Sequence, residues 1–156
     1  MKNNKIFYFL FVLGIIFTIN SSFTDTELKL NWLTNFEQVK IQAEKQNKKI
    51  LMSFSGSDWC ANCMRLDKTL FQTEEFKKYA EKNLILLKVD FPSRKKNALS
   101  KEQQTHNDKL ADKYNPKGLF PNTIIIDNNG EVLGSMKYPL NTASDYIKNI
   151  KGIVEQ

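Results

Sequence analysis

Short apolar runs that alternate with amphipathic segments constrain the fold of this chain more than any other feature. The runs predict strands at residues 28–32, 50–54, 84–89, 123–126 and 131–136, and helical spacing predicts helices at 35–47, 59–70, 74–82, 100–114 and 142–153. Asn35, Thr73 and Ser100 are the expected N-caps. Asn128-Asn129-Gly130 predicts a hairpin between the last two strands. Alternation followed by a hairpin predicts an α/β fold, with a central mixed β-sheet flanked by helices on both faces.

Composition limits the class of protein. The chain has 156 residues, of which 41% are apolar and 26% charged, with 6 Gly and 4 Pro. These values suit one globular domain and argue against collagen-like, disordered or mucin-like chains. A domain of this size buries enough apolar surface to fold without a metal or several disulfides. The net charge of +6 comes mostly from lysines scattered along the predicted helices, which is typical of a solvated surface.

The first 24 residues have the layout of a secretory signal peptide. Lys2 and Lys5 precede an uncharged apolar run over residues 6–19, and a mostly small and polar stretch follows it. The run is short for a bilayer, which needs about 20 residues. An uncleaved anchor in the inner membrane, formed by residues 6–19, is the alternative.

Removal of residues 1–24 would leave a mature domain over residues 25–156. Candidate cleavage positions follow Ser21, Ser22 and Thr24. The mature domain keeps a net charge of only +4, because the leader contains two lysines and no acid. That mild charge does not indicate a nucleic-acid partner. Export would place the domain in the periplasm or outside the cell, where disulfides persist.

Two cysteines separated by two residues carry the strongest chemical signal. Cys60 and Cys63 lie where the apolar run 50–54 gives way to a helix. A helix N-terminus offers unpaired N–H groups and the positive end of the helix dipole, which favour a thiolate at Cys60, the residue expected to be the more exposed. A thiolate attacks disulfides, and Cys63, about one helical turn further on, can then displace the product. The pair therefore predicts thiol–disulfide exchange.

Three other interpretations of the cysteine pair compete. Zinc usually takes four ligands, whereas the chain has two Cys and one His, so a metal site is not expected. A purely structural disulfide across so short a loop would restrict the unfolded chain little. Two unrelated buried thiols would not need a strand-to-helix position. Redox chemistry is favoured because the pair lies beside a strand–helix–strand pattern.

The stretch from Met52 to Cys63, MSFSGSDWCANC, with Phe120-Pro121 downstream, resembles the thioredoxin superfamily, and most closely its exported bacterial members with Gly-Ser-Asp-Trp-Cys. The resemblance covers most of residues 30–156. It implies a thioredoxin-like fold, Cys60 as nucleophile and Cys63 as resolving thiol, without a metal or organic cofactor. It also implies a cis-proline loop at Pro121 that faces the pair, where Pro121, Phe120 and Trp59 would contact an extended substrate. A trans proline at the start of a strand is the alternative for Pro121.

Two features depart from the family pattern. Thioredoxins have a buried acid in the strand before the motif, thought to shuttle a proton to the resolving cysteine, and Ser53 stands at the matching position. Lys88 falls near the family's partner lysine in the next strand, and without the acid its role is open. The dipeptide between the cysteines is Ala61-Asn62 rather than Gly-Pro. Because this dipeptide helps to set the reduction potential, no potential is carried over.

Other polar and aromatic residues near the motif have simpler interpretations. Trp59 is expected either to contact substrate or to pack under the loop. Asp58 is expected to cap the helix that follows, with a solvated side chain as the alternative. His106, in a polar stretch, is expected to be a solvated surface residue. Arg94-Lys95-Lys96 is expected to be part of an exposed loop over 91–99, and a patch for acidic partners is the minority interpretation.

The expected function is thiol–disulfide exchange with protein substrates by an exported oxidoreductase. Reduction or interchange is favoured over oxidation, because the resemblance is nearest to thioredoxin. A reductase in an oxidising compartment needs an electron donor, for which a membrane thiol relay is expected, and the domain is expected to be a monomer. The alternatives are a non-catalytic thioredoxin-fold binding module and a metal carrier that uses Cys60 and Cys63.

Overall fold

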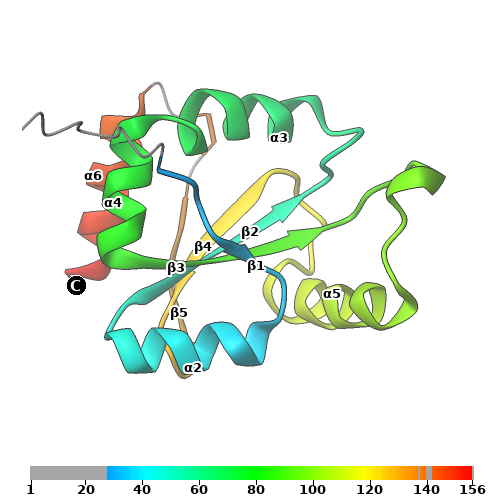
Figure 1. Cartoon of the computed structure of the whole chain (residues 1–156), viewed down its shortest axis with the longest axis horizontal. Coiled ribbons are helices and arrows are strands. Elements are labelled where there is room, and N and C mark those ends of the chain that lie inside the picture. Colours follow the sequence, from blue (N-terminus) through cyan, green and yellow to red (C-terminus); the bar gives the residue numbers. More distant parts are fainter. Residues whose placement is uncertain (1–27, 137, 140–141, 156) are drawn as a thin grey trace, which may run out of the picture.

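The computed structural model of the chain describes residues 28–136, 138–139 and 142–155 (Figure 1), and the predicted signal segment 1–24 lies outside these residues. In chain order the elements are β1 (Trp32–Leu33), α2 (Phe36–Gln46), β2 (Lys49–Ser55), α3 (Ala61–Leu66), the π-helical turn η1 (Asp67–Phe71), α4 (Glu74–Asn83), β3 (Leu84–Asp90), the 3₁₀ turn η2 (Lys95–Asn97), α5 (Lys101–Tyr114), β4 (Asn122–Ile126), β5 (Val132–Met136) and α6 (Ala143–Val154). This order reproduces the predicted alternation and the final hairpin.

The described strands form a mixed sheet in the order β1-β3-β2-β4-β5. β2 is parallel to β3, with Ile50 opposite Ile85, and β1 is parallel to β3 on its other side. β4 is antiparallel to β2, with Met52 opposite Ile124, and β5 is antiparallel to β4. The predicted hairpin turns at Gly130, whose φ of 86° glycine adopts without steric cost. The expected mixed sheet is therefore confirmed.

Each face of the sheet has its own apolar core, because successive side chains of a strand point to opposite faces. Leu51 of β2 packs with Phe76 of α4 and Ile150 of α6 on one face. Met52, the next residue, packs with Val39 of α2 on the other. Figure 1 shows α3, α4 and α6 on one side of the sheet and α2 and α5 on the other. Helices on both faces are thus confirmed, and each large apolar side chain buried in these cores contributes about 1.5–3 kcal/mol.

The predicted helix starts are largely correct. The side chains of Asn35, Thr73 and Ser100 each accept a hydrogen bond from the backbone N–H three residues further on. Each of these caps satisfies one of the N–H groups that the first turn of a helix leaves without a partner. The boundaries of α2, α4 and α5 follow from these local signals.

The first predicted strand was wrong in length. Of the expected run 28–32, only Trp32 lies in a strand, and β1 extends one residue further to Leu33, opposite Leu86 and Leu87 of β3. Lys29 and Asn31 are exposed. A strand at the edge of a sheet has a neighbour on one side only, so fewer ladder hydrogen bonds hold these polar residues in register.

The helix expected over 59–70 also differs in the structure. It begins at Ala61, after Cys60 in an extended conformation, and it widens at Asp67 into the π-helical turn η1. The last two residues of this turn, Leu70 and Phe71, are both buried in the apolar core. The loop predicted over 91–99 contains the 3₁₀ turn η2, whose residues are exposed.

Candidate active site

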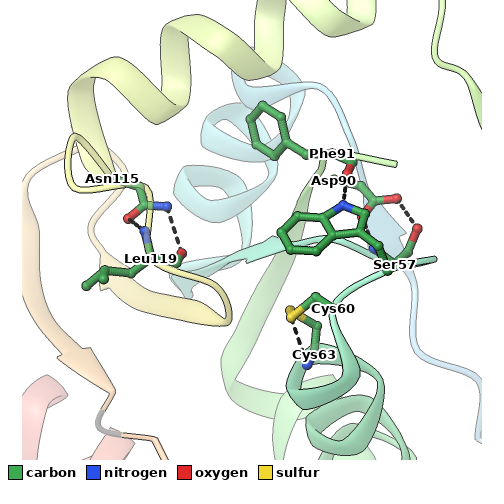
Figure 2. The surroundings of a disulfide bond; sticks show 8 residues. Ser57, Cys60, Cys63, Asp90, Phe91, Asn115 and Leu119 are labelled. Atoms are coloured by element: carbon green, nitrogen blue, oxygen red, sulfur yellow. Dashed lines mark hydrogen bonds between the residues drawn. A yellow bond between two sulfur atoms is a disulfide. The ribbon is translucent and has the colours of Figure 1, made fainter. Parts of the chain in front are cut away.

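The turn after β2 places the two cysteines at the start of α3 (Figure 2). The N–H of Cys60 donates to the carbonyl of Gly56 at 2.9 Å, which closes this turn. Cys60 is the N-cap of α3, and its sulfur accepts a hydrogen bond from the N–H of Cys63 at 3.1 Å. A disulfide joins Cys60 to Cys63. A backbone donor at the helix start therefore points at the Cys60 sulfur, as the position of the motif predicts.

Both cysteines lie just below the surface. Cys60 is 7% exposed and Cys63 is 5% exposed, so the greater exposure expected of Cys60 is slight in the disulfide form. Trp59, immediately before the pair, is 48% exposed, and Met64, immediately after it, is 47% exposed. The disulfide thus lies at the surface end of α3, between two side chains that a partner can reach.

The loop before β4 comes to the same end of the sheet. The peptide bond between Phe120 and Pro121 is cis, as the resemblance implies. Pro121 and Cys63 line one cavity, which places the proline loop beside the disulfide. The ring of Phe120 packs edge-on against Trp59, with centroids 5.4 Å apart. The fold therefore brings Trp59, Phe120 and Pro121 together around the cysteine pair.

Asn115 holds this proline loop in place, and the sequence analysis missed it. Its Nδ2 donates to the carbonyl of Leu119 at 2.9 Å, and its Oδ1 accepts from the N–H of Leu119 at 3.1 Å (Figure 2). The same Oδ1 accepts from the side chain of Asn122 at 3.1 Å. In the sequence, Asn115 before a proline is a sign that a helix stops. The buried amide of Asn115 also bonds the proline loop, and no pattern in the sequence indicates this contact.

The expectation that Asp58 caps the active-site helix was wrong. Its carboxylate accepts hydrogen bonds from the N–H of Ser93 at 2.9 Å and of Arg94 at 3.0 Å, and from Nδ2 of Asn97 at 2.8 Å. These donors, the N–H of Ser93 foremost, lower the pKa of Asp58 to about 2. Asp58 lies two residues before Cys60, which is itself the cap, so its side chain reaches the 91–99 loop instead.

Trp59 is fastened to the same loop. Its Nε1–H donates to the carbonyl of Phe91 at 2.6 Å. The absence of a side chain at Gly56 makes room for the indole, because a Cβ there would lie 2.3 Å from Cε2 of Trp59. Trp59 therefore packs on the loop and also exposes about half of its surface beside the disulfide, so both expected roles are sterically open to it.

A second carboxylate fixes the turn that leads to the cysteines. The N–H and Oγ of Ser57 donate to the two carboxylate oxygens of Asp90, at 2.9 and 2.5 Å (Figure 2). The carbonyl of Asp90 in turn accepts from Nδ2 of the buried Asn107 at 2.8 Å. The end of β3 is thus tied both to the active-site turn and to α5.

The expectation that His106 is a solvated surface residue was also wrong. Its Nε2 accepts the N–H of Phe36 at 3.2 Å, and the side chain is partly buried. Phe36 is the first residue of α2, and its N–H lacks a partner within the helix. His106 supplies that partner from α5, so it has a structural role between two helices.

A cavity of about 320 Å³, lined by both polar and apolar residues, lies beside the active-site helix, and Cys63 forms part of its wall. Ser53 and Lys88, which face each other across β2 and β3, line the cavity together with Asp67 of η1. Ser53 is buried. The position that holds an acid in thioredoxins thus carries a hydroxyl here, and the acidic residue that lines this cavity is Asp67.

Two further properties concern only the residues that the structure describes. Among them, no three His, Cys, Asp or Glu side chains come together so that they could hold a metal ion. No helix among them combines the length and apolar character needed to cross a membrane.

The fold and the cysteine pair define a class of protein. The family described as thioredoxin-like matches residues 31–123, and the chain belongs to this family. With a Cys-x-x-Cys pair at the start of the helix that follows a central strand, it is a thiol–disulfide oxidoreductase of thioredoxin-like fold.

Particular relatives are similar over different lengths. The chain is 31% identical over 126 residues to the disulfide bond reductase DsbH of Chlamydia pneumoniae, which covers 81% of this chain and 74% of that protein. A solved structure named DsbH oxidoreductase superposes with a TM-score of 0.75 at 28% identity, over 81% of this chain and 85% of that one. A shorter match, 36% identical over 63 residues, is to the thiol:disulfide interchange protein DsbD of Campylobacter jejuni (strain RM1221), and it covers 40% of this chain and 11% of that protein.

Proposed function

We propose that this chain is an exported disulfide reductase for protein substrates, with Cys60 and Cys63 as its catalytic pair. The observation that carries the proposal is the pair at the start of α3, with the N–H of Cys63 on the sulfur of Cys60 and the Pro121 loop beside it. The similarity to a protein named disulfide bond reductase supports the direction of the reaction.

Cys60 is the nucleophile of the proposed reaction. In the reduced protein the N–H of Cys63 stabilises the Cys60 thiolate through a charge-assisted hydrogen bond. The thiolate attacks one sulfur of a substrate disulfide, so that a mixed disulfide forms and the other substrate sulfur leaves as a thiolate, which takes a proton from water. Trp59, Phe120 and Pro121 contact the substrate chain at this stage.

Cys63 completes the exchange. Its thiol loses a proton to water and attacks the sulfur of Cys60, which breaks the mixed disulfide and releases the second substrate thiolate. The product is the Cys60–Cys63 disulfide that the structure contains, and two electrons have passed to the substrate. The cavity next to Cys63, which Ser53 and Lys88 help to line, is large enough to hold the water that accepts the proton.

Each turnover requires a dithiol that reduces the pair again. A membrane thiol relay fits this requirement if residues 1–24 direct export into an oxidising compartment, as their layout predicts. The 63-residue similarity to a thiol:disulfide interchange protein supports exchange between dithiols and disulfides at this pair. The proposal therefore places the domain in the periplasm, either free or held by residues 6–19.

Reduction of insulin by dithiothreitol tests the catalytic pair. The unmodified protein should accelerate the reaction, whereas Cys60→Ser should return the rate to background and Cys63→Ser should accumulate mixed disulfide. In the reduced protein, Cys60 should be alkylated with a midpoint below the pKa of about 8.5 of an ordinary thiol. A protein that reduces no disulfide and alkylates like free cysteine would be a binding module instead.

The reduction potential of the pair tests the direction of the reaction. Equilibration with glutathione buffers, followed by trapping of free thiols, would give this value. A potential more negative than about −200 mV supports a reductase, whereas a value near about −120 mV would indicate an oxidase.

A further inference from the structure

The disulfide lies within a surface of exposed apolar side chains. Trp59 and Met64 flank the pair along the chain and are each about half exposed, and the half-buried ring of Phe120 packs against Trp59. We name Trp59, Met64 and Phe120 the apolar rim. Exposed large apolar side chains that gather around a reactive group are typical of a surface that binds a partner.

A cluster of cations adjoins this rim. Arg94, Lys95 and Lys96, which we name the basic turn, are consecutive and exposed. Within the part of the chain that the structure describes, none of the three forms an ion pair with a carboxylate. The segment that carries them projects from the end of β3 in Figure 1. Their charges therefore face solvent.

The basic turn is held at a fixed position relative to the cysteines. Asp58, two residues before Cys60, accepts the N–H groups of Ser93 and Arg94 and the side chain of Asn97. Trp59 donates to the carbonyl of Phe91, where the loop begins. The residues that lead into the redox pair thus also anchor the basic turn, so that rim, disulfide and turn form one surface.

The Asp58 carboxylate offsets part of the charge of this turn, but neither Asp58 nor Asp90 forms an ion pair with its three cations. Asp58 is directed at backbone and amide donors of the loop, and Asp90 is directed at Ser57. Lys117, on the loop that leads to Pro121, is a further exposed cation. A partner that approaches the disulfide across the basic turn therefore meets positive charge, for which acidic side chains are complementary.

We propose that the basic turn selects protein substrates that carry acidic residues beside the cysteine to be reduced. This proposal rests on the function proposed above. The partner cysteine reaches Cys60, apolar neighbours rest on the apolar rim, and Asp or Glu side chains lie along the basic turn. The attraction raises the association rate, and it weakens as salt screens charges over about 10 Å at 0.1 M.

Matched peptides test this selection. Three disulfide-bonded peptides differ only at three neighbouring positions beside one cysteine, which are all Glu, all Gln or all Lys. The variant R94Q/K95Q/K96Q, called the basic-turn variant, removes the three positive charges of the basic turn. The control K78Q/K82Q/K148Q removes the same charge from α4 and α6, which lie at the other end of the molecule in Figure 1.

The unmodified protein should reduce the Glu peptide about fivefold faster than the Gln peptide at low salt. The basic-turn variant should lose this preference and keep its rate on the Gln peptide, whereas the control should behave like the unmodified protein. Equal losses on all three peptides, or an equal loss in the control, would overturn the proposal. So would binding of the unmodified protein, but not the basic-turn variant, to phosphatidylglycerol vesicles without any peptide preference, because the turn would then serve a lipid surface.

A binding measurement separates this proposal from the proposed function. A fluorescent Glu peptide with serine in place of cysteine should bind the oxidised unmodified protein more weakly in 0.5 M salt than at low salt. At low salt it should bind the basic-turn variant more weakly than the unmodified protein. If binding shows this pattern while no peptide is reduced, the acidic-partner surface stands and the reductase function falls. If all three peptides are reduced equally fast and binding does not depend on the basic turn, the reductase function stands and the acidic-partner surface falls.

Discussion

Asp58 joins two segments that meet only in the folded protein. Its carboxylate accepts hydrogen bonds from Ser93, Arg94 and Asn97, which lie more than thirty residues further along the chain. Its neighbour Trp59 bonds the same loop. The Gly-Ser-Asp-Trp stretch before Cys60 therefore does more than form a turn, because two of its side chains set the position of the 91–99 loop.

Acid should release this attachment, which Asp58→Asn tests. The folded pKa of Asp58 is about 2, below the usual value of 3.8, so the ionised group favours the folded state above about pH 4 and loses that effect as the pH falls to about 2. Urea unfolding at pH 4, 3 and 2 should show the unmodified protein more stable than the variant at pH 4, with the difference shrinking toward pH 2. A difference that does not depend on pH would contradict the assignment.

Gly56→Ala should displace Trp59. The new Cβ would lie 2.3 Å from the indole, closer than real contacts allow, so the ring must give up its bond to Phe91 and its contact with Phe120. We expect a loss of about 1–3 kcal/mol in the free energy of unfolding, and a shift in the NMR signal of one of the two indole N–H groups of the chain.

Gly152→Ala is the matched control for Gly56→Ala. A Cβ at Gly152 of α6 would meet nothing within 4 Å, and alanine favours a helix by up to about 1 kcal/mol over glycine. The control should therefore leave both indole signals in place. If Gly56→Ala also left them in place, the indole would not depend on the space at this glycine.

At the scale of elements, α5 acts as a brace for the site. Asn107 on its buried face donates to the carbonyl of Asp90 and accepts from Gln103 at 2.8 Å. Asp90 ends β3 and also holds Ser57 of the active-site turn. α5, on the far side of the sheet from α3, thus contributes to the position of the active-site turn.

Asn107→Ala should destabilise the fold by about 1–3 kcal/mol, because Asp90 loses a buried donor and Gln103 loses an acceptor. The exposed Thr105→Ala on the same helix is the control, since threonine and asparagine have similar helix propensities. Urea unfolding of both variants gives the comparison. Equal stabilities would show that the Asn107 amide does not brace β3.

At the scale of the whole molecule, the sheet order explains why the site has three parts. β2 and β3 are parallel, so the turn to Cys60 and the 91–99 loop both follow the carboxyl ends of their strands, at the same end of the sheet. β4 is antiparallel to β2, so the Pro121 loop enters the sheet at that end. The cysteine turn, the basic turn and the proline loop meet there because strand direction determines which ends lie together.

The predicted signal segment over residues 1–24 leads to a prediction about export. Expressed as the full chain in a Gram-negative host, the protein should be recovered from the periplasm with its N-terminus after Ser21, Ser22 or Thr24. Mass spectrometry and cell fractionation measure this outcome. Full-length protein in the inner membrane would indicate the anchor alternative, and full-length protein in the cytoplasm would contradict export.

Local pattern was enough to predict most of this architecture. Apolar runs and N-cap residues predicted the order of strands and helices, because hydrogen bonding and side-chain alternation within an element depend on residues a few positions apart. The cysteine spacing and the resemblance of MSFSGSDWCANC also led to the family and to the cis peptide bond before Pro121.

The attachments around the site were decided only by tertiary structure. Asp58 meets Ser93 and Arg94, Ser57 meets Asp90, and His106 meets Phe36. These partners are more than thirty residues apart, and each polar group has many candidate partners in the sequence. Which pair forms depends on which strand ends the sheet brings to one edge and on which N–H groups it leaves unpaired there.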